Sequence, residues 1–141
     1  MHNPKYVKRF FDRLYASLSR LAASLGLPED YLLGLSAYES QYDNNHNMAL
    51  HNPFGLTAAG GNNLRFKSVD DAVKYWKGLY GDQVQGATSA ANFVQRLEGK
   101  LNGTPVEGWH RYNSVNSNWE ENVTGTINSI AHRKDSWKAG P

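Results

Sequence analysis

The sequence predicts an α+β domain that is mainly α, with one small β-hairpin among the helices. Five segments carry apolar side chains at the three- and four-residue steps of one helix face. A glycine-rich turn at residues 58–63, between two short apolar runs, is typical of a hairpin instead. At 141 residues the chain suits one compact domain, and we place residues 1–141 in it.

The clearest helical pattern lies in residues 1–26, which we expect to form an N-terminal amphipathic helix. Its periodic apolar residues are Val7, Phe11, Leu14, Leu18, Leu21 and Leu25. Gly26 then ends the helix. A second helix is predicted from about Glu29 to Tyr42. The polar residues 43–55 that follow show no period and are expected to form a functional loop.

The middle of the chain predicts the hairpin and two further helices. Residues 54–57 and 64–67 flank the glycine-rich turn and are expected to pair as short strands. Ser68 and Ser89 are good N-caps, and an apolar stripe follows each of them.

The C-terminal part predicts one more helix and a tail. Asn118, with Glu121 three residues later, resembles a capping box and starts a helix that runs through Ile130. The polar residues 131–141 are expected to form a flexible tail.

Composition excludes several classes of protein. The absence of cysteine removes disulfides, thiolate metal sites and cysteine nucleophiles. No apolar run approaches the length of a membrane span, and the N-terminus lacks the features of a signal peptide. The net charge of +2 would help with an anionic polymer, but it is too weak to indicate nucleic acid.

Glu39 is an acidic residue that the predicted second helix places in unusual surroundings. Its neighbours three, four and seven positions earlier are Ser36, Leu35 and Leu32, so it shares a small and apolar face. Loss of hydration and the helix dipole would both raise its pKa. A carboxyl that keeps its proton near neutral pH can protonate the leaving oxygen of a glycosidic bond. Periodicity alone favours a plainer alternative, in which Glu39 is exposed or paired with a lysine or arginine.

Several short motifs follow one another in a fixed order. They are Leu35-Ser36-Ala37-Tyr38-Glu39-Ser40, Asn52-Pro53-Phe54-Gly55-Leu56, Arg65-Phe66 with the segment 68–76, and Tyr112-Asn113-Ser114 followed by Trp119. Together they resemble a bacterial glucosaminidase (mannosyl-glycoprotein endo-beta-N-acetylglucosaminidase-like) domain of the lysozyme superfamily. The match covers residues 27–130, and the ordered set is more specific than any one motif.

This resemblance implies a lysozyme-like helical domain in which a β-hairpin forms one wall of the substrate cleft. In that family a Glu-Ser pair ends a helix and carries the general acid, which implies Glu39 as the catalytic residue. The residues that the resemblance assigns to substrate binding are Ser40, Asn52, Phe54, Gly55, Tyr75, Tyr112 and Asn113.

A second catalytic carboxylate is missing where relatives place one, because residues 44–64 contain no Asp or Glu. Asp43 would project from the same helix as Glu39, so we interpret it as an anchor for the helix end or the loop. Asp70 and Asp71 fit the first turn of a helix, where the dipole favours acids. The absence favours attack by the N-acetyl group or 6-hydroxyl of the substrate, or by a held water. The side chains that could orient these groups are Asn52, Tyr75, Tyr112 and Asn113.

Other chemistries lack their sequence signatures. His46 and His51 lie in the polar segment near Asp43, but a catalytic zinc site needs three well-placed ligands. No His-Glu-x-x-His motif, nucleophile elbow or phosphate-binding loop is present. We therefore expect neither a metal nor a cofactor.

The predicted activity is cleavage of a β-1,4 bond between N-acetylglucosamine and N-acetylmuramic acid in peptidoglycan, by a glycosidase of the N-acetylglucosaminidase or muramidase type. Two alternatives stay open: a lytic transglycosylase that yields 1,6-anhydro products, and a non-catalytic cell-wall-binding module. We expect a monomer that binds no nucleic acid and inserts into no membrane.

The predicted place of action is the bacterial cell wall or periplasm. Without a signal peptide, the chain would be exported by another route or be excised from a longer protein. A phage lysin, a secreted toxin and a housekeeping enzyme remain alternatives. A toxin would have an immunity or inhibitor protein as its partner.

Overall fold

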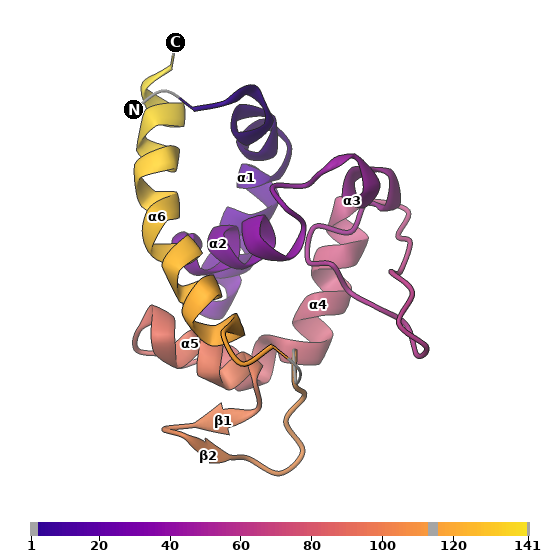
Figure 1. Ribbon diagram of the computed structural model, residues 1–141, viewed down its shortest axis with the longest axis vertical. Coiled ribbons are helices and arrows are strands. Elements are labelled where there is room, and N and C mark those ends of the chain that lie inside the picture. The colour runs from indigo at the N-terminus through magenta and orange to yellow at the C-terminus, as the bar shows by residue number, and fades with distance from the viewer. Residues whose placement is uncertain (1–2, 113–115, 141) are drawn as a thin grey trace.

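The computed structural model describes residues 3–112 and 116–140. Its helices are α1 (Lys5–Leu25), α2 (Glu29–Glu39), α3 (Asn45–Leu50), α4 (Val69–Val84), α5 (Ala90–Leu97) and α6 (Trp119–Ala139), and its antiparallel strands are β1 (Lys100–Leu101) and β2 (Thr104–Pro105) (Figure 1). The predicted class, α+β and mainly α, is confirmed. None of the described helices has both the length and the apolar character needed to cross a membrane.

α1 forms as its apolar stripe predicts. The side chains of that stripe are buried, and they include Phe11, Leu14 and Leu18 at 0% exposure. Gly26 caps the helix in the left-handed conformation, with φ of 69°, and its N–H bonds to the carbonyls of the last turn. Glycine adopts this conformation without a steric cost, so the helix ends where the pattern ends.

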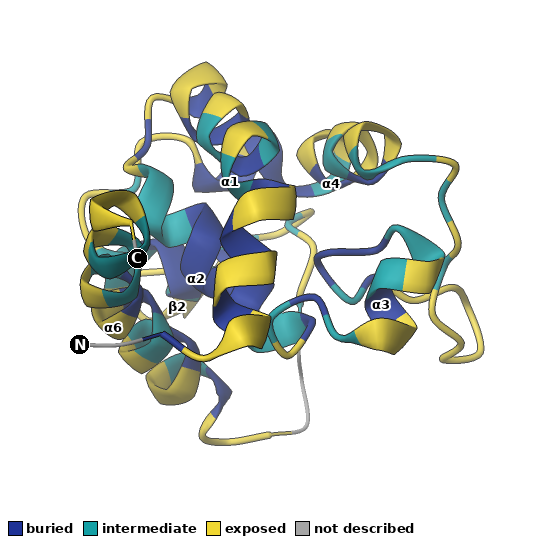
Figure 2. Cartoon of the chain, turned by 90° about the horizontal axis from the view of Figure 1, so that it is seen from above, coloured by how far each residue is buried: buried dark blue, intermediate teal, exposed yellow. Residues whose placement is uncertain are grey.

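α2 is the central helix and is covered on several sides. Residues 32–37 are buried without a break, which Figure 2 shows as a dark blue helix between α1 and α6. α6 comes very close at Gly34, where an added Cβ would lie 2.5 Å from the Cγ1 atom of Ile127 and 2.6 Å from its Cα. The missing side chain therefore allows the two helices to approach each other.

The predicted hairpin at residues 54–67 is only partly formed. Its strand pairing is reduced to an isolated bridge between Thr57 and Asn63. The regular two-stranded sheet lies instead at β1 and β2, where no strand was predicted. Asn102 and Gly103 connect these strands with φ of 52° and 82°, as a two-residue turn with positive φ at both positions requires. This Asn-Gly pair is a strong hairpin signal in the sequence.

Asn52 holds together the two arms of the loop at residues 54–67. Its side-chain amide donates to the carbonyls of Leu56 at 2.8 Å and Leu64 at 2.9 Å. Its Oδ1 accepts the N–H of Leu56 at 2.9 Å. One buried side chain thus joins the two arms of the loop, beside backbone bonds from Leu64 to Leu56 at 2.9 Å and from Ala58 to Asn62 at 2.8 Å.

The polar segment after α2 is partly helical, which corrects the prediction of an aperiodic loop. The side chain of Asn44 caps α3 by accepting the N–H of Asn47 at 3.0 Å. α2 itself ends at Glu39 and not at Tyr42. A helix of six residues with polar side chains has too short a stripe for periodicity to reveal it.

The C-terminal helix is longer than predicted, since α6 continues where residues 131–141 were expected to form a flexible tail. The ring of Trp137 stacks on Phe11 with centroids 5.2 Å apart. The ammonium group of Lys134 lies 3.0 Å from a carboxylate oxygen of Glu29. Lys134 and Glu29 lie more than 100 positions apart in the sequence, so no local sequence pattern could predict their contact.

Substituting Gly34 with alanine tests how closely α2 and α6 are packed. The new methyl group would overlap Ile127, so Gly34→Ala should lower the free energy of unfolding by about 1–3 kcal/mol. Gly78 on α4 is the matched control, because an added Cβ there meets nothing within 4 Å. Gly78→Ala should raise stability by up to about 1 kcal/mol. Urea unfolding followed by circular dichroism measures both changes, and equal changes would contradict the close approach.

Candidate active site

Glu39 ends α2 with its carboxyl largely withdrawn from water. Trp119, the first residue of α6, donates its indole N–H to the Oε1 atom of Glu39 at 2.7 Å. This bond joins residues 80 positions apart in the sequence. Among the described residues, no lysine or arginine pairs with Glu39. The plainer alternative, an exposed or ion-paired carboxyl, is therefore wrong.

Burial gives the carboxyl of Glu39 an unusual acidity. Its pKa is raised from 4.5 to about 7, chiefly because burial removes water from the charged form. The hydrogen bond from Trp119 lowers this pKa, and the charge of Glu98 raises it. Near neutral pH the group is present in both protonation states. It can therefore hold a proton and also give it up.

Two tyrosines and Trp119 form an aromatic wall beside Glu39. The ring of Tyr112 stacks on Trp119 with centroids 5.6 Å apart, and it lies 4.9 Å from the ring of Tyr80. Burial and then the charge of Glu39 raise the pKa of Tyr80 to about 12 and that of Tyr112 well above its usual value. Both hydroxyls therefore keep their protons at neutral pH. The hydroxyl of Tyr112 donates to the carbonyl of Phe54 at 2.8 Å, which fixes the wall against the loop.

Glu98 is a second carboxylate whose charge acts on Glu39, and it lies outside residues 44–64, where the sequence has no Asp or Glu. It follows the last residue of α5 and is only 6% exposed. Its charge raises the pKa values of both Glu39 and Tyr80, so the three groups share one electrostatic cluster. The carbonyl of the preceding Leu97 accepts the backbone N–H of Tyr112 at 2.8 Å, which ties this corner to the aromatic wall.

A local signal for Glu98 was present in the sequence. Glu98 lies four residues after Val94 and three before Leu101, on the apolar stripe of the predicted helix that follows Ser89. An acid on a stripe that faces the core is out of place unless it has a function or a partner.

The Asn-Pro-Phe-Gly segment presses against the end of α2. The hydroxyl of Ser36 donates to the carbonyl of Pro53 at 2.6 Å. Gly55 has a φ of 61°, and an added Cβ would lie 2.8 Å from the carbonyl oxygen of Glu39. The glycine of the motif is thus explained by the close approach of two backbones at the acid.

Three predicted substrate-binding residues are buried, which corrects their assignment. Ser40, Asn52 and Phe54 are each 0% exposed. The ring of Phe54 stacks on Trp76 at 4.9 Å, and the other two side chains bond to nearby backbone. These side chains support the backbone around Glu39 and leave no surface for a sugar.

The other predicted binding residues lie nearer the surface or outside the described part of the chain. Tyr75 is 46% exposed and makes an edge contact with Phe66 at 5.5 Å. Gly55 and Tyr112 are partly exposed. Asn113 lies outside the described residues. Contact of these groups with a ligand stays a prediction.

The chain leaves Glu39 through a left-handed turn. Gln41, Tyr42 and Asp43 have φ values of 49°, 58° and 54°. This conformation costs roughly 1–2 kcal/mol for each residue that is not glycine. The buried carboxylate of Asp43 accepts the Nε proton of Arg13 at 2.8 Å, which holds the turn in place. Asp43 is therefore an anchor, as its position in the sequence indicated.

Within residues 3–112 and 116–140, no three metal-binding side chains gather in one place. The Nε2 atom of His46 lies 3.1 Å from the side-chain oxygen of Asn63. The Nδ1 atom of His51 lies 3.1 Å from the carbonyl oxygen of Phe66. Each imidazole thus has a hydrogen-bonding partner in the loop region.

The fold has a counterpart among solved structures. The chain is similar to one in the structure of a type VI secretion system effector–immunity complex from Pseudomonas protegens, with a TM-score of 0.76. The likeness covers 93% of this chain and 95% of that one, at 24% sequence identity. It establishes the fold. No family model and no curated protein sequence matches the chain, so the glucosaminidase resemblance depends on the motifs alone.

Glu39→Gln should stabilise the protein above neutral pH. The folded carboxyl binds its proton more tightly than the unfolded one, so the stability of the parent falls as pH rises from about 4.5 through about 7. At about 1.4 kcal/mol per pKa unit, the variant should gain about 3 kcal/mol on the parent between pH 4 and pH 8. Thermal unfolding across this range measures the gain, and a difference that does not change with pH would contradict it.

Two substitutions should move the pKa of Glu39 in opposite directions. Glu98→Gln removes a nearby negative charge and should lower it, whereas Trp119→Phe removes a donor to the carboxylate and should raise it. An NMR titration of the Glu39 carboxyl carbon measures both shifts. Glu121→Gln, at an exposed acid in the first turn of α6, is the control and should leave the titration unchanged. The cluster would be disproved if Glu98→Gln behaved like this control.

Proposed function

We propose that the chain is a glycoside hydrolase that cleaves the glycan strands of peptidoglycan, with Glu39 as its general acid. The observation that carries this proposal is the buried carboxyl at the end of α2, whose pKa is about 7. The leaving oxygen of a glycosidic bond must receive a proton as the bond breaks. A carboxyl that is still protonated near neutral pH can supply it.

The surroundings of Glu39 suit both halves of that step. The proton passes from Glu39 to the bridging oxygen, and the electron pair of the broken C1–O bond goes to the same oxygen. The indole N–H of Trp119, 2.7 Å away, then stabilises the carboxylate that is left. Water adds to C1 of the sugar, and one of its protons returns to Glu39. If the 6-hydroxyl of the sugar adds instead, the product is a 1,6-anhydro sugar.

Glu98 helps the acid in this proposal through its charge. A negative charge nearby makes Glu39 release its proton less readily to water, which keeps it protonated at higher pH. The same charge favours the positive sugar centre that forms as the bond breaks. We assign Glu98 this electrostatic role and not that of a nucleophile, because its side chain is buried.

The biological role that we propose is that of a toxin. The structural neighbour from Pseudomonas protegens belongs to a type VI secretion system effector–immunity complex, which favours the toxin among the predicted alternatives. We therefore propose that the chain acts in the cell wall or periplasm of a bacterium, and that an immunity protein is its partner.

Digestion of purified peptidoglycan tests the activity. Glu39→Gln should lower kcat by about 10²–10⁴-fold, which is the usual contribution of a general acid. Because the reaction uses the protonated carboxyl, the kcat of the parent should fall as pH rises above about 7. Release of soluble fragments, followed by chromatography at several pH values, measures both effects.

The control for this experiment is Glu121→Gln, the same substitution at an exposed acid, which should digest peptidoglycan like the parent. Mass spectrometry separates the outcomes, since a hydrolytic product is heavier by one water than its anhydro counterpart. Fragment release by Glu39→Gln at the parent rate would disprove the role of Glu39. If the parent sediments with cell walls and releases nothing, the chain is a binding module.

A further inference from the structure

A groove lined by tyrosines lies next to the proposed active site. It has a volume of about 640 Å³ and lies between the start of α1, the turn after α2 and the middle of α6. Its lining residues are Tyr6, Ala37, Tyr38, Gln41, Tyr42 and Thr126. None of these side chains takes part in the proton transfer, so the groove, here called the tyrosine groove, needs its own explanation.

A row of α6 residues leads from Glu39 toward the tyrosine groove, and its first member, Trp119, is only 2% exposed. Trp119, Asn122 and Thr126 follow one another at steps of three and four residues, so they share a helix face. Trp119 bonds to Glu39 at one end of this row. Asn122 donates to the hydroxyl of Tyr38 at 3.5 Å in its middle, and Thr126 lines the groove at the other end. The row spans about 10 Å along the helix axis. A strand that passes Glu39 over the exposed Asn122 and the hydroxyl of Tyr38 would reach the groove.

The side chains of the tyrosine groove suit a carbohydrate. Tyr6 is 47% exposed and contacts the ring of Tyr42 with centroids 5.7 Å apart. The C–H faces of sugar rings pack on such aromatic surfaces, and Gln41 and Thr126 add an amide and a hydroxyl that can bond to sugar hydroxyls. The guanidinium of Arg133 lies over the ring of Tyr42 at 5.4 Å. It places a positive charge beside the groove, where a carboxylate of peptidoglycan would be favoured.

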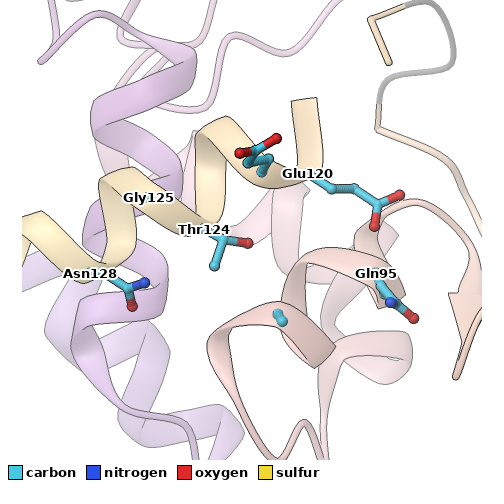
Figure 3. Close-up of a pocket in the computed structure, with 7 residues that line it drawn as sticks. Gln95, Glu120, Thr124, Gly125 and Asn128 are labelled. Atoms are coloured by element: carbon cyan, nitrogen blue, oxygen red, sulfur yellow. The ribbon is translucent and has the colours of Figure 1, made fainter. Parts of the chain in front are cut away.

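The hollow on the other side of α6 also has amide and hydroxyl side chains but differs in its rings and its charge. Figure 3 shows it between α5 and α6, with the side chains of Gln95, Glu120, Thr124 and Asn128 around it. It has no aromatic lining, and its charged side chains are the acids Glu120 and Glu121. Glu120 pairs with Lys100 at 2.6 Å. With acids and no aromatic ring in its lining, this hollow suits an anionic glycan less well than the tyrosine groove does.

We infer that the tyrosine groove is a glycan-binding subsite, which holds the sugars of the same peptidoglycan strand beyond the bond at Glu39. The inference rests on the proposed function, because the strand is the polymer that Glu39 would cleave. The left-handed turn at Gln41 and Tyr42 then has a use: it keeps two groove residues in place beside the acid. The subsite adds binding energy away from the reacting bond.

Sedimentation with insoluble peptidoglycan tests this subsite without any turnover. All variants are made in the Glu39→Gln protein, in which the proposed cleavage is removed, and sedimentation itself measures binding without requiring turnover. Tyr6→Ala removes an exposed ring, and Thr126→Met fills the groove without adding a charge. Each should weaken binding about 3–10-fold, as expected for the loss of one ring contact. Leu101→Ala, at an exposed apolar residue of the β1–β2 hairpin, is the control and should bind like its parent.

The same variants in the active protein provide a second measurement. Tyr6→Ala should raise the KM for peptidoglycan and leave kcat within about twofold of the parent, because the groove does not touch the reacting bond. Unchanged sedimentation of both groove variants would overturn the subsite. Equal weakening by Leu101→Ala would overturn it as well. Loss of inhibitor-protein binding with unchanged sedimentation would make the groove a protein interface instead.

Discussion

The hydrogen bond from Trp119 to Glu39 is the contact on which the site depends, and it requires α2 and α6 to lie very close together. Gly34 permits this approach, because a side chain there would overlap Ile127. The close packing has two opposite effects on the carboxyl. It removes water, which raises the pKa, and it brings an N–H to 2.7 Å, which limits the rise. A pKa of about 7 is the balance of the two, so a looser contact between the helices would change the acidity of Glu39 even if every side chain were kept.

Two further segments hold the end of α2 from other directions. The loop that contains Gly55 lies against the backbone of Glu39, and Asn52 gives that loop its shape with three hydrogen bonds. The left-handed turn leads the chain away from Glu39. The ion pair between Arg13 and the buried Asp43 stabilises this strained turn. Strained backbone is stored where the surrounding structure determines it, commonly at functional sites. The residues around Glu39 therefore serve mainly to fix a position, which explains why several of them are fully buried.

The sequence predicted those features that depend on residues close together in the chain. The spacing of apolar residues predicted α1, and the position of Glu39 on a small, apolar helix face indicated its raised pKa. Contacts between residues far apart in the chain could not be predicted from such local patterns. The stripe that contains Trp119 indicated burial correctly, at 2% exposure, but nothing in it reveals that the indole N–H meets a residue 80 positions earlier. Glu98 was overlooked because its effect on Glu39 depends on how α5 packs. The hairpin was misplaced because residues 54–67 pair only at an isolated bridge, while a short Asn-Gly turn formed strands at β1 and β2.

The long sequence separation between Glu39 and Trp119 links acid strength to the completion of folding. Trp119 begins the final helix, which docks through the contacts of Lys134 with Glu29 and of Trp137 with Phe11. Closing a loop of this length costs chain entropy, which only the docking of the whole helix offsets. Until α6 is in place, Glu39 is an ordinary solvated carboxyl that is ionised in neutral solution. A nascent or partly unfolded chain therefore lacks a proton donor of the required strength, and the protonation of one side chain reports that the last helix has docked.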